Sequence, residues 1–159
     1  MPIPEFIRAL REHVGSAPLW LPAVAAVVVR PGTAGEEVLL VRRADNGAWT
    51  PVTGILDPGE EPAVGAMREV LEETGVVAVA DRLVWAHATH EVEFENGDRS
   101  AFLSLCFRCS WVSGDPYVAD DESSDTRWFG VGELPDLEPD QRRRIDLALA
   151  DAPEAVFAR

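Results

Sequence analysis

Lysine is absent from this chain of 159 residues, and all 14 of its basic side chains are arginines. Asp and Glu number 28, so the formal net charge is -14. A surface that coats nucleic acid is basic, and this charge therefore predicts no nucleic-acid partner. Arginine suits bidentate contacts with phosphate, but a compositional bias of the source genome explains the missing lysine more simply.

Cysteine is scarce, with only Cys106 and Cys109 in the chain. A zinc site built on such a C-x2-C pair needs a second pair of ligands, and the histidines show no matching spacing. The surrounding segment is typical of a strand, in which an odd separation directs two side chains to opposite faces. We therefore expect two ordinary strand residues.

Long apolar runs are missing as well. No segment approaches the ~20 apolar residues that a membrane-spanning helix needs, and the first residues lack the basic-then-apolar layout of a secretion signal. These features predict a cytoplasmic protein with no membrane partner. The length is sufficient for one domain with a substantial core.

The chain does contain short β-branched runs separated by turns. Residues 20–29 and 38–43 predict a strand hairpin, and residues 49–53, 76–88, 100–112 and 126–130 predict further strands. Helical spacing predicts helices over residues 3–14, 62–74 and 141–150, with an acidic loop over 120–125. We expect an α+β fold with helices covering a mixed sheet. We divide the chain into an N-terminal helix and lead-in (1–18), a main domain (19–152) and a C-terminal tail (153–159).

The central helix carries the strongest chemical signal. Glu69, Glu72 and Glu73 fall on one face of it, within an arc of roughly 100°. On the opposite side we expect apolar residues that face a core: Ala63, Ala66, Met67, Val70 and Leu71. Like charges at this spacing destabilise a helix, and such violations concentrate at functional sites. Carboxylates suit Mg2+ or Mn2+, ions that also bind substrate phosphates. The pattern predicts a metal site for phosphate chemistry, and a solvated acidic helix face is the alternative.

The wider spacing favours the metal site. It resembles the complete Nudix box, which reads here as Gly54-x5-Glu60-x7-Arg68-Glu69-Val70-x-Glu72-Glu73-x-Gly75-Val76. The resemblance implies the Nudix fold, a βαβ sandwich with a central mixed sheet flanked by helices. It also implies hydrolysis of a nucleoside diphosphate linked to another moiety, as in a nucleoside triphosphate or ADP-ribose, by water attack on phosphorus. The cofactor implied is Mg2+ or Mn2+. Thr53 departs from the family, because many members have glycine at that position.

Residue roles follow from the same resemblance. By position, Glu72 and Glu73 correspond to the main metal ligands, and Glu69 to a further ligand or the general base. The carbonyl of Gly54 corresponds to a backbone ligand. Glu60 and Arg68, the remaining charged residues of the box, correspond to a pair that orients the loop and the helix carboxylates.

Outside the box, Glu122 resembles an additional metal-binding or catalytic glutamate that some members carry before a Trp-containing strand. Neighbouring acids could substitute for it: Asp120, Asp121 and Asp125. Arg42 and Arg43 are candidate substrate contacts, but strand alternation sends them to opposite faces, so we expect at most one to reach the ligand. A substrate role for His87 or His90 is a weaker expectation.

A different class of function remains open, namely a Nudix-fold module that binds a nucleotide or metabolite without cleaving it. Such modules usually have eroded boxes, whereas this box is intact, which favours the enzyme. The expected partner is a small nucleotide. The 3–14 helix fits either a dimer contact, which would make the protein a homodimer, or a lid.

Overall fold

The computed structural model describes residues 3–94, 96–150 and 152–158. Positions 1, 2, 95, 151 and 159, which fall within the segments predicted above, lie outside the described residues. The helices are α1 (Glu5–Val14), α2 (Pro62–Thr74) and α3 (Pro139–Leu149), with a 3-10 turn η1 (Val131–Glu133). The strands are β1 (Leu19–Gly32), β2 (Gly35–Arg43), β3 (Trp49–Thr50), β4 (Val52–Ile55), β5 (Val77–Ala88), β6 (Val92–Glu93), β7 (Arg99–Ser113), β8 (Ser123–Gly130) and β9 (Val156–Phe157).

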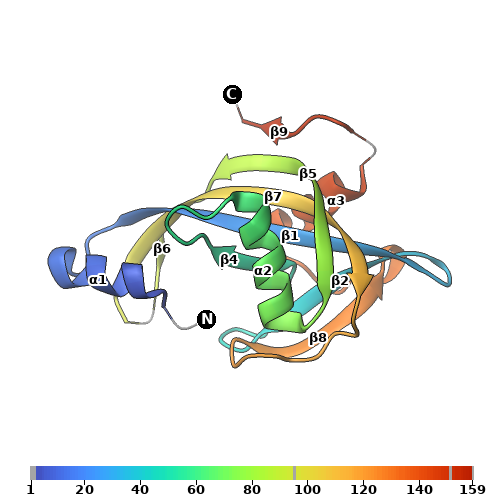
Figure 1. The fold of residues 1–159 in the computed structure, drawn as a ribbon, viewed down its shortest axis with the longest axis horizontal. Coiled ribbons are helices and arrows are strands. Elements are labelled where there is room, and N and C mark those ends of the chain that lie inside the picture. Colours follow the sequence, from blue (N-terminus) through green and yellow to red (C-terminus); the bar gives the residue numbers. More distant parts are fainter. Residues whose placement is uncertain (1–2, 95, 151, 159) are drawn as a thin grey trace.

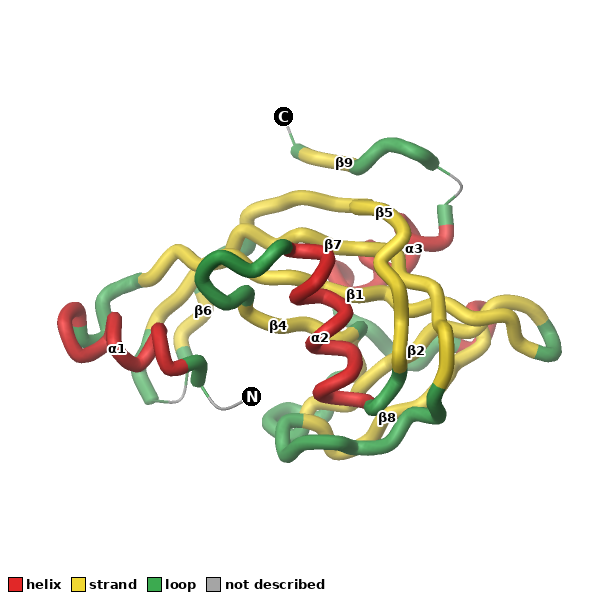
Figure 2. Tube along the Cα trace, viewed as in Figure 1, coloured by secondary structure: helices red, strands yellow, loops and turns green. Residues whose placement is uncertain are grey.

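The described strands form one mixed sheet with β1 near its centre. The order along the main path is β3-β2-β1-β7-β5-β9, and β4, β6 and β8 pair with β1, β7 and β2. β1 runs parallel to β7 and antiparallel to both β2 and β4. Helix α2 lies in front of this sheet and α3 behind it (Figure 1), and the colouring by secondary structure in Figure 2 shows the same layers. The predicted α+β fold with a mixed sheet between helices is confirmed.

The apolar run in β1 is buried on both faces of the sheet. Alternate residues pack in two separate clusters: Val24, Ala26 and Val28 lie on the α2 side, whereas Ala25, Val27 and Val29 lie on the α3 side. A strand covered on both faces needs apolar residues at every position, which explains why this run does not alternate with polar residues. Two helices are therefore enough to enclose the core.

Cys106 and Cys109 follow the same rule. Cys106 packs in the α3-side cluster and Cys109 in the α2-side cluster, and both are free thiols. Burial raises the pKa of each thiol to about 12. Protonated, fully buried thiols are poor nucleophiles, so these are packing residues, as the strand pattern predicts.

Three elements differ from the sequence prediction. β8 begins at Ser123, which pairs with Arg43, so only residues 120–122 of the predicted acidic loop precede the strand. α3 begins at Pro139, two residues early, because proline suits a first helical position. β9, which no periodicity signalled, pairs with Trp85 and Ala86 of β5. Among the described residues, no helix is long and apolar enough to cross a membrane.

The segment after β7 closes the C-terminal end of α2. Gly75 ends the helix in the left-handed region with φ 69°. The amide of Tyr117 donates to the Thr74 carbonyl at 3.0 Å, and the amide of Ala119 donates to the Glu73 carbonyl at 3.2 Å. These bonds satisfy helix carbonyls that would otherwise lack partners and bring Asp120 beside the last turn of α2.

Candidate active site

Helix α2 places two of its glutamates inside the protein. Glu69 is 1% exposed and Glu73 is 5% exposed, whereas Glu72 faces solvent. The expectation that the glutamates lie opposite the core-facing residues is therefore wrong. At ~100° per residue, Glu69, Glu73, Ala66 and Val70 form one continuous arc, and that arc faces the sheet. Leu71, expected in the core, is 51% exposed because it lies on the far side of this arc.

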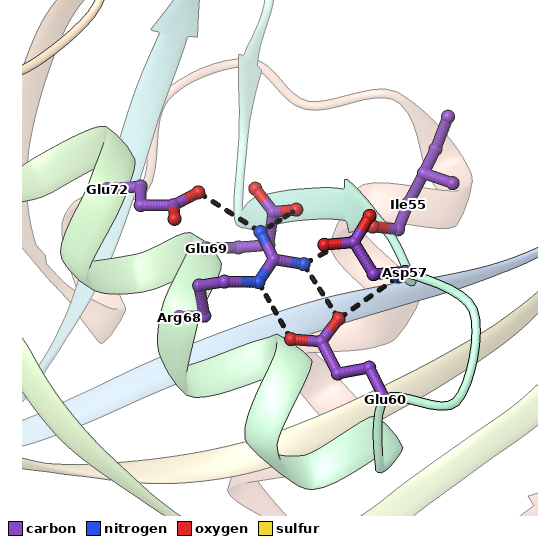
Figure 3. Close-up of polar contacts among 6 residues, drawn as sticks. All are labelled: Ile55, Asp57, Glu60, Arg68, Glu69 and Glu72. Atoms are coloured by element: carbon purple, nitrogen blue, oxygen red, sulfur yellow. Dashed lines mark hydrogen bonds and ion pairs between the residues drawn. The ribbon is translucent and has the colours of Figure 1, made fainter. Parts of the chain in front are cut away.

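Arg68 connects the carboxylates of the site (Figure 3). Its Nε and Nη2 donate to the two carboxylate oxygens of Glu60 at 2.7 and 2.8 Å, the bidentate geometry that gives strong charge-assisted bonds. Its Nη1 donates to Glu69 at 2.9 Å and to Glu72 at 3.0 Å. One guanidinium thus holds three glutamates in place.

The loop before α2 is fixed by the same network. The amide of Asp57 donates to Glu60 Oε2 at 3.1 Å, and Arg68 Nη2 also reaches the Ile55 carbonyl at 3.4 Å (Figure 3). A Cβ added at Gly65 would lie 2.9 Å from Glu60 Oε2, so the helix leaves room for this carboxylate. Glu60 and Arg68 therefore tie the end of β4 to α2.

Gly54 directly contacts the buried glutamate. An added Cβ at Gly54 would lie 2.0 Å from Glu69 Cδ, closer than any side chain tolerates. Its φ is not in the left-handed region, so glycine is required here for close approach. The neighbouring Thr53, the departure from the family pattern, pairs with Ala25 in an extended strand. The contact places the backbone of β4 against the Glu69 carboxylate.

Burial perturbs the two inner carboxylates. Desolvation raises the pKa of Glu69 to about 7, against the opposing effect of the Arg68 charge. Desolvation also raises the pKa of Glu73 to about 8, with further contributions from the charges of Glu69 and Asp120. Strongly shifted acids of this kind mark candidate functional sites.

The remaining predicted site residues lie at the end of β2 and in the loop before β8. The charge of Arg43 acts on Glu73, and Arg43 also pairs with Asp45 at 2.5 Å. Arg42 instead donates to the Gly47 carbonyl at 3.0 Å. The amide of Glu122 donates to Asp120 Oδ1 at 3.1 Å, and its carbonyl accepts from Ala44. The charge of Asp120, in the same loop, acts on Glu73.

The donor set fits a hard divalent cation. Glu69, Glu72 and Glu73 supply carboxylate oxygens, the ligands that Mg2+ and Mn2+ prefer, and Gly54 brings backbone beside them. Among the described residues, no three Asp, Glu, His or Cys side chains already converge as a metal cluster. Arg68 holds one oxygen of Glu69 and one of Glu72, and these bonds leave the second oxygen of each carboxylate available to a metal.

A surface hollow of about 530 Å³ lies elsewhere, where the β1–β2 turn meets the end of β7. Its lining includes Arg30, Glu36, Arg108 and Trp111 and none of the box residues. The buried carboxylates with raised pKa values lie instead on α2.

Comparison with known proteins places this geometry in a family. The profile of the NUDIX domain matches residues 20–148. The MutT-like protein of Streptomyces ambofaciens is 36% identical over 123 residues, which cover 77% of this chain and 72% of that protein. A crystal structure of a NUDIX hydrolase from Nitrosomonas europaea superposes with a TM-score of 0.63 at 22% identity, covering 86% of this chain and 77% of the other.

A further relative is longer than this chain. The NAD-capped RNA hydrolase NudC of Pseudomonas aeruginosa is 32% identical over 123 residues, covering 74% of this chain but only 41% of NudC. The similarity to both relatives and the domain match span the complete box and the strands around it. The chain belongs to the Nudix hydrolase family.

Proposed function

We propose that this protein is a pyrophosphohydrolase that cleaves a nucleoside diphosphate linked to another moiety, using Mg2+ or Mn2+. The observation that carries the proposal is the pair of buried carboxylates, Glu69 and Glu73, on a complete Nudix box. Desolvating two acids on one helix face is costly without a compensating charge. A divalent cation supplies that charge.

The site residues take the roles that the family pattern implies. Glu69, Glu72 and Glu73 would hold the cation, together with the Gly54 carbonyl and with Glu122 from the loop before β8. A bound divalent ion neutralises phosphate oxygens and lowers the pKa of a coordinated water. Glu60 and Arg68 hold the loop after β4 against α2.

Proton transfer falls to a buried carboxylate near that water. Glu69 is either this general base or a further ligand, because it is fully buried and contacts the Gly54 backbone. An acid whose pKa lies near the working pH is suited to accept a proton. Water then attacks phosphorus, and the leaving phosphate departs with the linked moiety or the nucleoside.

Arg43 is the better candidate of the two strand arginines for contact with substrate phosphate. Its charge acts on Glu73, whereas the Arg42 guanidinium is bonded to the β2–β3 turn. The absence of a nucleic-acid partner remains a prediction from net charge. The NudC relative is an NAD-capped RNA hydrolase, so capped RNA belongs in the substrate panel.

The test is turnover of a substrate panel by the wild-type protein. The panel contains nucleoside triphosphates including oxidised ones, ADP-ribose, other dinucleotide-type pyrophosphates and capped RNA, each with Mg2+, with Mn2+ and with EDTA. We expect hydrolysis of at least one compound, with the products of pyrophosphate cleavage and full loss of the reaction in EDTA. Equal rates with and without metal would contradict the proposal. Tight binding of a compound with no turnover would instead support the non-catalytic binding module.

A further inference from the structure

Arg144, on the face of the sheet opposite α2, is a buried arginine that forms no ion pair with any described residue. It is 7% exposed; Nη1 donates to the Gln141 amide oxygen at 3.0 Å, Nη2 to the Ser104 hydroxyl at 3.4 Å, and Nε is buried with no partner. Among the described residues, no carboxylate lies within ion-pair distance of it. Arginine is rarely buried unless paired, because an uncompensated buried charge is costly.

His87 lies beside this arginine and is also unsatisfied. Both of its ring nitrogens are buried without a hydrogen-bond partner, and its ring stacks on Trp85 at 3.6 Å between centroids. Burial lowers the pKa of His87, and the charge of Arg144 lowers it further. The neutral ring offers one N–H donor and one acceptor. Two neighbouring side chains thus present unused polar atoms.

The first turn of α3 combines a helix N-terminus with one acid, Asp140. α3 begins at Pro139, and its N-cap residue Glu138 makes no side-chain capping bond. The N-terminus of a helix favours an anion. The Arg144 side chain reaches back to Gln141 in that turn, so the guanidinium and the helix end lie on the same side.

The register of the sheet connects this region with the catalytic loop. His87 pairs with Ser104, Ser104 with Ala23, and Ala23 with Ile55. Three strand spacings of about 4.8 Å separate the two ends of this row, roughly 14 Å in all. Ile55 follows Gly54 directly, and Ala23 and Ile55 are partly exposed. Ala23 shares its face of the sheet with Ala25, so this row lies on the α3 side and ends one residue away from Gly54.

We propose that Arg144 and His87, with Gln141 and Ser104 beside them, form a subsite for a second oxyanion of the substrate, a phosphate or carboxylate remote from the scissile pyrophosphate. The proposal rests on the proposed function, since it names what is linked to the nucleoside diphosphate. A ligand oxygen replaces the Gln141 amide on Nη1 and accepts from Nε, and the His87 N–H donates to a second oxygen. Gln141 is partly exposed and can turn aside.

A structural rival is Asp140, whose charge acts on both Arg144 and His87. If its carboxylate serves as the partner of Arg144, then removing the arginine lowers stability and affects every substrate equally. A role in binding a second oxyanion instead affects only substrates that carry one. The two roles therefore separate in a comparison of matched substrates.

The experiment uses compounds that differ by one anionic group. NADP+ against NAD+ and coenzyme A against dephospho-coenzyme A test a phosphate, and UDP-glucuronate against UDP-glucose tests a carboxylate. We expect wild type to favour the more anionic member of at least one pair by about tenfold or more in kcat/KM, through KM. Arg144→Met should bring that ratio close to one. Arg142→Met, which removes an exposed arginine of the same helix, should leave it unchanged.

Equilibrium binding of the same compounds in EDTA provides a readout that does not depend on turnover. The anionic preference should persist there and be lost in Arg144→Met, so an inactive protein still tests the subsite. His87→Phe, which keeps a ring to stack on Trp85, serves as the second variant if Arg144→Met does not fold. No anionic preference in wild type, or an equal loss for both members of every pair, would overturn the proposal.

Discussion

Single residues determine the electrostatics of this site. Glu69 and Glu73 are held in the protein by α2, and their pKa values lie at about 7 and about 8 because burial penalises the charged forms. Arg68 opposes this effect at Glu69 through an ion pair at 2.9 Å. Without a metal, ionising both carboxylates therefore acts against folding.

The first prediction concerns the pH dependence of stability. Between pH 4.5, the ordinary value for a glutamate, and pH 8, the folded metal-free protein binds more protons at Glu69 and Glu73 than the unfolded chain does. The free energy of unfolding should then fall as pH rises through this window, by up to about 1.4 kcal/mol per pH unit for each group. Thermal melting in EDTA from pH 5 to pH 8.5 measures it.

The comparison variants are Glu73→Gln and Glu61→Gln. Glu73→Gln should flatten this pH dependence, whereas Glu61→Gln, which alters an exposed residue before the same helix, should leave it as in wild type. His87, whose pKa is lowered, contributes with the opposite sign below its ordinary pKa, so the difference between variants isolates the carboxylate. A Glu73→Gln protein with the wild-type slope would contradict the assignment.

The second prediction concerns Gly54. Gly54→Ala places a methyl group 2.0 Å from Glu69 Cδ, so the glutamate or the β4 backbone must move. We expect a loss of about 1–3 kcal/mol in the free energy of unfolding and a larger relative loss of hydrolysis. Gly132→Ala is the control, because nothing lies within 4 Å of an added Cβ there and its φ is not left-handed. Equal effects of the two variants would count against a special role for Gly54.

At the residue scale, the sequence predicts which box residues lie close together better than it predicts where their side chains point. The spacing from Gly54 to Gly75 lies within one loop and one helix, so local geometry brings these residues together. The burial of Glu69 and Glu73 depends on which arc of α2 faces the sheet. Counting the apolar Leu71 as a core residue placed this arc on the wrong side of the helix, because Leu71 is exposed. The spacing of Arg144 did carry a signal. It stands four residues before the apolar Ala148 in the predicted helix, which places both side chains on one face, and both are buried.

At the scale of elements, the segment after β7 is a clamp on α2. Tyr117 and Ala119 bond the last carbonyls of the helix, and the Tyr117 ring occupies the space beside Gly75. Asp120 and Glu122 follow directly, so the clamp determines how the acidic loop before β8 faces Glu73. The position of this loop depends on the helix end.

The third prediction tests the clamp by a double-mutant cycle. An added Cβ at Gly75 would lie 2.0 Å from Tyr117 Cε1, in a left-handed backbone. Gly75→Ala should lower the free energy of unfolding by about 1–3 kcal/mol, and Tyr117→Ala alone should cost little because the ring is 61% exposed. The double variant should recover the part caused by the clash, as measured by urea unfolding. Strict additivity would show that the ring does not press on Gly75.

Elements were predictable where their pattern is local. The segments that form β1, β2, β5 and β7 are rich in apolar and β-branched residues. Pro62 marks the start of α2 and Gly75 its end. β9 has only two residues and owes its existence to pairing with β5, which no local pattern can signal. The early start of β8 likewise follows from its register with β2.

At the scale of the whole molecule, one mixed sheet between α2 and α3 carries the two sites, one on each face. The box lies on the α2 side and the Arg144 group on the α3 side, and β1, β4 and β7 connect them. Helix α1 contributes differently: Ile7 is buried, and Arg11 donates to the Arg99 carbonyl at 2.8 Å on the β6–β7 hairpin. It lies at one end of the sheet (Figure 1).

The fourth prediction follows from this arrangement. We propose that the main domain over residues 19–152 folds without α1, since neither the box nor the two main core clusters includes a residue of α1. A chain lacking residues 1–18 should unfold cooperatively at a lower temperature and keep most of its kcat. Comparing its mass in solution with that of the full chain also distinguishes a dimer contact from a lid as the role of this helix. An unfolded product would contradict this division of the chain.

The central claim is that the carboxylates of α2 carry out metal-dependent pyrophosphate hydrolysis. The most direct test is kcat/KM of Glu72→Gln and Glu73→Gln on the best substrate of the panel, at saturating Mg2+, beside Glu61→Gln as the matched control. We predict that each site variant loses about 100-fold or more in kcat/KM while its melting temperature stays well above the assay temperature. The kcat/KM of Glu61→Gln should stay near that of wild type. Site variants that hydrolyse at the wild-type rate would contradict the claim.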